Sequence, residues 1–172
     1  MANRAASTKT PKPLYTPAER ARRDATPWTL VQGVLAPVQF VVFLISVALV
    51  LRFLMTGDGA VVATWSVIIK TLVLYAIMVT GAIWEKAVFG HYLFVPAFFW
   101  EDMFSMLVLA LHTLYIAAVL FGWFSLTEQM YIAMAAYATY LINAGQFLWK
   151  LRQARLSAPT PAVDAHIAGG LV

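Results

Sequence analysis

Four long runs of hydrophobic residues dominate the pattern of this 172-residue chain. Each run reaches the roughly 20 residues that an α-helix needs to cross a hydrocarbon core about 30 Å thick. In lipid, a helix is the open-chain structure that satisfies its own backbone hydrogen bonds. The pattern therefore predicts an all-α integral membrane protein with four transmembrane helices, at about residues 28–51, 60–84, 103–124 and 130–149.

Polar segments divide and flank these runs. Gly57, Asp58 and Gly59 separate the first two, and residues 122–127 separate the last two. Before the first run, Thr16 followed by Pro17 and Glu19 predicts a capped amphipathic turn over 16–24. We expect three parts, namely a basic cytoplasmic tail (1–27), a four-helix transmembrane domain (28–150) and a mostly disordered cytoplasmic tail (151–172).

Composition and charge narrow the class of protein. The chain is 62% hydrophobic and 12% charged, against about half and a quarter in a soluble domain, which excludes a soluble monomer. It has no cysteine, which excludes thiolate catalysis and iron–sulfur clusters. The net charge of +4 does not indicate a nucleic-acid partner, because nine of the twelve basic residues lie before residue 28 or at 150–155. The positive-inside rule then places both termini and residues 85–101 in the cytoplasm.

Polar residues inside the predicted spans are the first candidates for function. Lys70 and His112 fall near the middle of their helices, and Gln39 lies at a similar depth. A lysine there costs roughly 2.5–3.5 kcal/mol, so it must face the bundle interior or water. The alternative for these residues and for Asn143 is structural, namely interhelical hydrogen bonds or, for Lys70, a snorkelling side chain.

A second group of candidates lies on the predicted cytoplasmic side. It comprises three carboxylates, one lysine, one histidine and four aromatic residues: Glu85, Glu101, Asp102, Lys86, His91, Trp84, Phe98, Phe99 and Trp100. Pro96 predicts a bent interfacial segment between the second and third helices. A partly desolvated carboxyl group beside aromatic rings suits a general acid acting on a flat apolar ligand. The alternative is that Glu101 and Asp102 only complement a helix dipole.

Common motifs of other chemistries are missing from the sequence. It contains no HExxH, no glycine-rich phosphate loop and no GxSxG motif. His112 is the one histidine in a predicted span, so a haem held by two membrane histidines is excluded. ATP, nicotinamide and flavin therefore find no support as ligands, and no protein-held metal is expected.

Three stretches of the chain resemble the 3-vinyl bacteriochlorophyllide hydratases. They are LYTPAERARRDATPWTLVQGVLAPVQF, the region containing MVTGAIWEKAVFG and PAFFWEDMFSMLVLALHT, and AAYATYLINAGQFLWKLRQARL. The resemblance covers about residues 14–156, and its WEK and PAFFWED blocks are specific. It implies addition of water to the C3 vinyl group of chlorophyllide a or bacteriochlorophyllide a, giving the 3-(1-hydroxyethyl) product in bacteriochlorophyll a biosynthesis.

The same resemblance implies a setting and partners. We expect a multi-pass protein of the inner, intracytoplasmic photosynthetic membrane, with no cofactor and no nucleic-acid partner. Its partners would be the magnesium chlorin, water, membrane lipid and other enzymes of bacteriochlorophyll synthesis. The alternatives are a non-catalytic pigment-binding or assembly subunit of the photosynthetic membrane, or a small transporter lined by Lys70 and His112.

For this reaction the residues suggest roles. We expect Glu101 or Asp102 to donate a proton to the vinyl group, with Glu85 in reserve, and His112 is a candidate axial ligand of the substrate magnesium. Lys86 or Arg22 would hold the propionate, and aromatic rings would stack on the macrocycle. His112 lies about 16 Å along its helix from Glu101, so its role competes with that of the carboxylates. The remaining substrate-binding candidates are Trp84, Phe98, Phe99, Trp100, His91, Lys70, Gln39 and Asn143.

Overall fold

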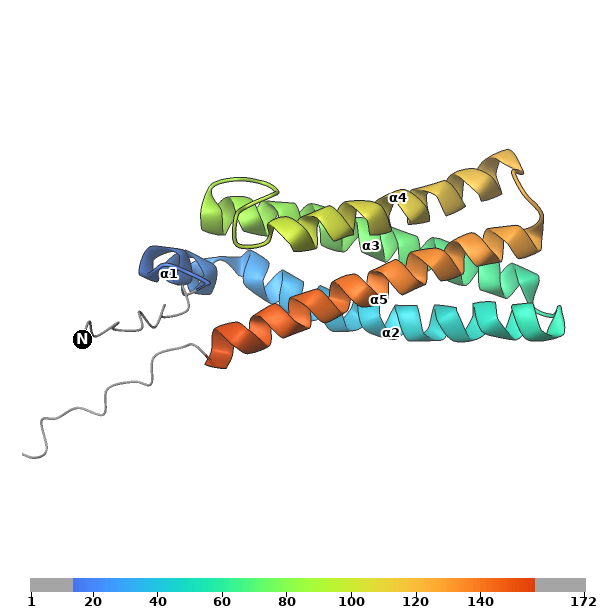
Figure 1. Cartoon of the computed structure of the whole chain (residues 1–172), viewed down its shortest axis with the longest axis horizontal. Coiled ribbons are helices and arrows are strands. Elements are labelled where there is room, and N and C mark those ends of the chain that lie inside the picture. The colour runs from blue at the N-terminus through green and yellow to red at the C-terminus, as the bar shows by residue number, and fades with distance from the viewer. Residues whose placement is uncertain (1–13, 157–172) are drawn as a thin grey trace, which may run out of the picture.

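The computed structural model describes residues 14–156 as an all-helical bundle (Figure 1). The predicted disordered segment after residue 156 therefore lies outside the described residues. Five helices follow one another in this part of the chain: α1 (Pro17–Ala25), α2 (Pro27–Thr56), α3 (Ala60–Phe89), α4 (Phe99–Phe121) and α5 (Leu126–Leu156).

Helix α1 confirms the capped turn that the sequence predicts. The Thr16 hydroxyl accepts a hydrogen bond from the Glu19 amide, and the Glu19 carboxylate accepts one from the Thr16 amide at 2.7 Å. Pro17 occupies the first turn, where its missing N–H costs nothing. The helix packs against α3, so residues 17–25 are a docked element of the fold.

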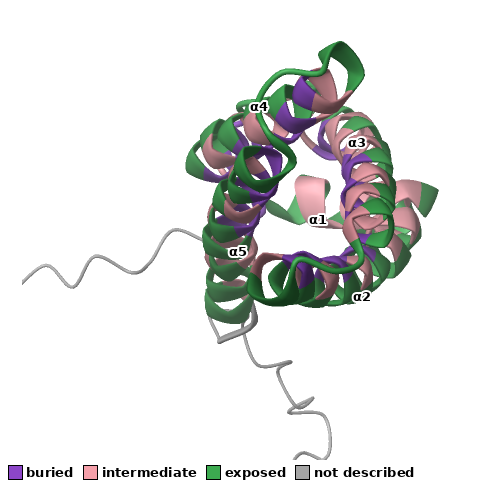
Figure 2. Ribbon diagram, turned by 90° about the vertical axis from the view of Figure 1, so that its right-hand side faces the viewer, coloured by how far each residue is buried: buried purple, intermediate pink, exposed green. Residues whose placement is uncertain are grey.

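Helices α2 to α5 form a four-helix bundle in which sequence neighbours pair most closely. Helices α2 and α3 make one tight hairpin, α4 and α5 make another, and the two hairpins contact each other much less (Figure 2). Gly57 and Gly59, with φ of 78° and 83°, make the first connection, and Gly122, with φ of 64°, follows α4. These conformations favour glycine because it has no Cβ.

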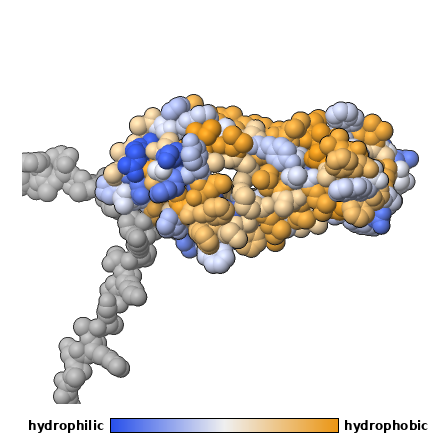
Figure 3. Space-filling view, turned by 90° about the horizontal axis from the view of Figure 1, so that it is seen from above, coloured by the Kyte–Doolittle hydropathy of each residue, from blue (hydrophilic) through white to orange (hydrophobic). Residues whose placement is uncertain are grey.

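Three helices are long and apolar enough to cross a membrane: α2, α3 and α4. Large apolar side chains cover much of the outer surface, and hydrophilic residues gather at one end of the molecule (Figure 3). Helix α5 has 31 residues but is less apolar, because it carries Asn143, Gln146 and Lys150 on its length. The apolar helices indicate a membrane protein, whereas a fourth span stays a prediction.

The helices extend beyond the predicted spans. Helix α3 continues to Phe89 and α4 begins at Phe99, four residues before the predicted start. A 30-residue helix is about 45 Å long and so exceeds a hydrocarbon core of about 30 Å. The extension places all three candidate carboxylates on helices. They lie at the end of the bundle that also holds α1, the α3–α4 connection and the end of α5 (Figure 1). We call this the acidic end.

Candidate active site

Three buried carboxyl groups meet at the acidic end. Glu85 comes from the last turns of α3, and Glu101 and Asp102 come from the first turn of α4. Their exposed fractions are 6%, 6% and 3%, so none of them points into open solvent. In the part of the chain that the structure describes, the other acidic side chains lie outside the buried core. The structure therefore brings together the three residues that the sequence proposed as proton donors.

Glu85 and Asp102 form a contacting pair. One Asp102 oxygen accepts a hydrogen bond from the Phe94 amide at 2.7 Å, and Phe94 has a φ of 59°, which is rare for a residue with a side chain. The Glu85 carboxyl group interacts with Asp102 and with the Val95 amide, and its Oε2 atom has no hydrogen-bond partner. Ionised carboxylates only accept hydrogen bonds, so a bond between these two requires a proton on one of them. Two adjoining buried carboxyl groups are suited to share one proton.

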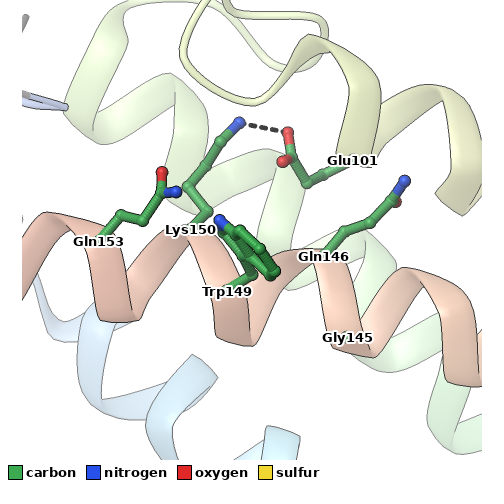
Figure 4. Close-up of a pocket in the computed structure, with 6 residues that line it drawn as sticks. All are labelled: Glu101, Gly145, Gln146, Trp149, Lys150 and Gln153. Carbon is green, nitrogen blue, oxygen red and sulfur yellow. Dashed lines mark hydrogen bonds and ion pairs between the residues drawn. The ribbon is translucent and has the colours of Figure 1, made fainter. Parts of the chain in front are cut away.

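Glu101 has a different partner. The Lys150 ammonium lies 2.5 Å from its carboxylate (Figure 4). It also donates a hydrogen bond to the Ala97 carbonyl. The same ammonium lies 5.0 Å from the ring centroid of Phe98. As an ion-paired carboxylate, Glu101 accepts protons and has none to donate. The arrangement favours Glu85 or Asp102 as the acid and Glu101 as a base or a positioning group.

A groove opens beside the ion pair. Its volume is about 460 Å³, and its walls come from α4 and the last turns of α5. Ligand sites commonly enclose about 300–1,000 Å³, so the groove can take a sizeable part of a flat ring (Figure 4). Trp149 presents a largely exposed indole there. The lining residues are Glu101, Gly145, Gln146, Trp149, Lys150 and Gln153.

The predicted aromatic residues divide into two groups. Phe98 and Trp84 pack inward, with ring centroids 5.8 Å apart, in a cluster that includes Tyr15 and Phe147. Burial raises the pKa of the Tyr15 phenol, as expected for a packed ring. Phe99 and Trp100 are exposed. Trp84 and Phe98 therefore pack inside the acidic end, whereas Phe99 and Trp100 are the two predicted aromatic residues with exposed rings.

The predicted cationic residues lie at the same end but outside the groove lining. Lys86 is exposed, donates a hydrogen bond to the Gly90 carbonyl at 2.7 Å and lies 5.4 Å from the Tyr92 ring. His91 is exposed as well. The Arg22 side chain donates to the Val88 carbonyl at 2.6 Å, which fastens α1 to the end of α3.

Lys70, His112 and Gln39 are buried in the middle of the bundle, away from the groove. The Lys70 ammonium lies 3.9 Å from the ring centroid of Tyr140, and the His112 ring lies 5.9 Å from that of Tyr137. We call these five residues the polar centre. Asn143 lies three residues after Tyr140 on α5, so the two are neighbours on the helix, and it donates a hydrogen bond to Ser105 at 2.8 Å.

Of the six residues that line the groove, sequence reasoning proposed only Glu101 as a site residue. Lys150 is the partner of Glu101, and Gln146 and Trp149 form neighbouring parts of the wall. A signal was present, because Tyr140, Asn143, Gln146 and Lys150 recur at helical spacing and mark one polar face. The sequence did not reveal which helix this face meets.

Comparisons with known proteins identify the family. The profile of the family described as 2-vinyl bacteriochlorophyllide hydratase matches residues 15–153. A protein of that name from Rhodobacter capsulatus is 69% identical over 147 residues, which is 86% of this chain and 85% of the relative. One of the same name from Cereibacter sphaeroides is 68% identical over 143 residues, or 83% of this chain and 89% of the relative. No solved structure matches the chain.

The names of the family and of these relatives place the vinyl group at position 2, whereas the family that the sequence motifs resemble carries it at position 3 in its name. The match covers the carboxyl pair, the ion pair and the whole groove. It also favours an enzyme over a non-catalytic subunit or a transporter. The chain therefore belongs to the 2-vinyl bacteriochlorophyllide hydratase family, and it is accordingly a hydro-lyase.

Proposed function

We propose that this hydro-lyase adds water to the vinyl group of a magnesium chlorin, bacteriochlorophyllide a or chlorophyllide a, in bacteriochlorophyll a biosynthesis. The names of the relatives support the substrate class. The observation that carries the proposal is the buried Glu85–Asp102 pair next to the groove that Glu101 and Lys150 line. Asp102 directly follows Glu101, which lines the groove, so a proton held by the pair lies close to the groove wall.

The reaction begins with proton transfer to carbon. The proton shared by Glu85 and Asp102 moves to the terminal vinyl carbon, which becomes a methyl group. The adjacent carbon becomes a cation, and the conjugated macrocycle delocalises its charge. A water oxygen then bonds to that carbon and loses one proton, which returns to the carboxylate pair directly or through Glu101. The sum is one vinyl group plus one water giving one 1-hydroxyethyl group.

The protein contributes position and electrostatics. Burial of the pair next to two further charged groups orients the acid before the substrate arrives, which general acid catalysis requires. Trp149 and the exposed Trp100 are our candidates for stacking on the macrocycle. Exposed Lys86, at the same end, is our candidate for the propionate. His112 lies about 15 Å along α4 from Asp102, so the proposed pigment position leaves it without a magnesium to bind.

We place the protein in the inner photosynthetic membrane, with α5 as a fourth span and both termini in the cytoplasm. Three apolar helices support the membrane setting. The start of α1, the α3–α4 connection and the end of α5 lie at one end of the bundle, as an even number of crossings requires (Figure 1). The excess of arginine and lysine at this end favours the cytoplasmic side.

The test is hydration of defined pigments by purified protein. Chlorophyllide a and bacteriochlorophyllide a are supplied separately in oxygen-18 water. The products are separated by chromatography, and their molecular masses are measured by mass spectrometry. We expect a more polar product, heavier by one water and carrying the label. Unchanged pigment with both substrates, from protein that remains folded, would refute the proposal.

A further inference from the structure

Buried polar atoms without hydrogen-bond partners occur on all four helices of the bundle. In the described part of the chain they include Gln146 Oε1, Asn143 Oδ1, Lys70 Nζ, His112 Nε2 and both amide atoms of Gln39. Lys70 and His112 have no exposed surface, and Gln39 is 1% exposed. A buried polar atom left unpaired costs about 1–3 kcal/mol, so a set of this size indicates a ligand that completes it.

These atoms form a column that begins at the groove. Tyr137, Tyr140, Asn143 and Gln146 each lie three residues from the next, so consecutive members are neighbours on α5, while the row turns about the helix by about 60° per step. Gln146 is part of the groove wall. Asn143 is held by Ser105, which lies one turn from Asp102 on α4. The column therefore joins the acidic end to the polar centre.

At its inner end the column is closed by contacts from all four helices. Lys70 of α3 lies over Tyr140, and His112 of α4 lies next to Tyr137. The Tyr137 hydroxyl is hydrogen-bonded at 2.5 Å to Ser46 of α2. Val67 and Val108 are fully buried. This packing favours a small occupant.

The unpaired atoms define the chemistry of the occupant. The His112 Nδ1 atom lies 2.8 Å from the Val108 carbonyl, which can only accept, so Nδ1 carries the proton and Nε2 is an acceptor. Lys70 only donates, whereas Gln39 can do both. An anion would suit Lys70 but not His112. Water donates and accepts, and a buried water typically has two to four polar partners.

The expected number of waters is consistent with the column. Proteins hold on the order of one buried water per 27 residues, which gives about five for the 143 described residues. Lys70, His112, Gln39 and Asn143, which the sequence suggested as substrate-binding residues, would then bind water instead of the pigment.

We propose that the column from Gln146 to the polar centre binds a file of water molecules and supplies the water consumed in the reaction. This role rests on the proposed function, because a flat apolar pigment that fills the groove blocks bulk water from that side. The attacking oxygen then comes from the protein interior, past Asn143, and the file refills after product leaves.

The first test measures bound water in pigment-free protein. Brief X-ray pulses convert bound water into hydroxyl radicals, which oxidise adjacent side chains, and mass spectrometry gives the labelling rates. Tyr137 is the reporter, and Phe98 is the control, because their exposed fractions are 2% and 3% but Phe98 lies among aromatic rings. After correction for intrinsic reactivity, we expect Tyr137 to be labelled several-fold faster. Equal rates would overturn the proposal.

The second test blocks the column. Asn143→Leu is expected to lower kcat several-fold at an unchanged KM for the pigment, and to slow the labelling of Tyr137. Exposed Ile142→Leu is the matched control. Lys70→Met, which removes a donor from the polar centre, should slow the labelling of Tyr137 as well. An unchanged kcat in Asn143→Leu would overturn the supply role. Labelling in wild-type protein is read without pigment, so failure of pigment hydration would refute only the proposed function.

Discussion

Replacing Glu85 by glutamine tests the carboxyl pair most directly. The glutamine has nearly the same shape, and its amide can donate a hydrogen bond to Asp102, so the contact at the end of α3 is kept. The variant removes the proton that one carboxyl group donates to the other. Because Glu85 is buried and faces Asp102, no bulk water replaces that donor. The change therefore isolates proton donation from packing.

The expected loss follows from the role of the proton. A positioned general acid contributes about 10²–10⁴-fold to a rate. At 1.36 kcal/mol per tenfold, this is about 2.7–5.5 kcal/mol of activation free energy. Asp102→Asn should lose a similar amount, because the two groups hold one proton between them. The double variant should be little worse than either single variant, since residues that act as a unit are not additive.

Initial rates of pigment hydration, measured over a range of pigment concentrations, give kcat and KM separately. We expect kcat to fall and KM to stay within about threefold, because the groove itself is unaltered. Asp58→Asn, an exposed carboxylate at the opposite end of the bundle, is the matched control. Full activity in both single variants and in the double variant would refute the pair as the acid.

Three further predictions concern the surroundings of the pair. Lys150→Met leaves the Glu101 carboxylate buried without a partner, so it should lower the free energy of unfolding of detergent-solubilised protein by about 3 kcal/mol. The double variant Lys150→Met, Glu101→Gln should recover this stability. An unchanged free energy of unfolding in Lys150→Met would show that the ion pair is not buried in solution. Trp149→Ala should raise the pigment KM more than it lowers kcat, and an unchanged KM would remove this indole from the binding surface. Thr16→Ala should cost about 1 kcal/mol of cap stability and speed proteolytic cleavage within α1, which Thr16→Ser should not do.

Local features of the fold could be predicted from the sequence. The Thr16–Pro17–Glu19 pattern correctly indicates the start of α1, because each residue satisfies a specific group in the first turn. The glycine breaks and the apolar runs are likewise local signals. The predicted starts and ends of the helices were less accurate. The thickness of the lipid sets how many residues cross the membrane, but a helix can continue beyond the membrane surface.

Contacts between helices could not be predicted from the sequence. Glu101 and Lys150 are 49 residues apart, and hydrophobic periodicity gives the face of a helix without its register against a neighbour. The same limit applies to Glu85 and Asp102, which were proposed as separate candidates and form a pair. Phe98 looked like a ring-stacking residue, but it packs inward because a cluster with Tyr15 and Phe147 buries it.

The ion pair between Glu101 and Lys150 has a consequence for biogenesis. Ribosomes make Lys150 more than twenty residues after α5 begins, so a partly synthesised chain carries the first hairpin and the start of α4 without the last wall of the groove. If the groove binds the pigment as proposed, the nascent protein can neither bind the pigment nor hydrate it during insertion. The groove is completed in a single step, when α5 docks against α4. We expect a chain that is truncated before Lys150 to be inactive.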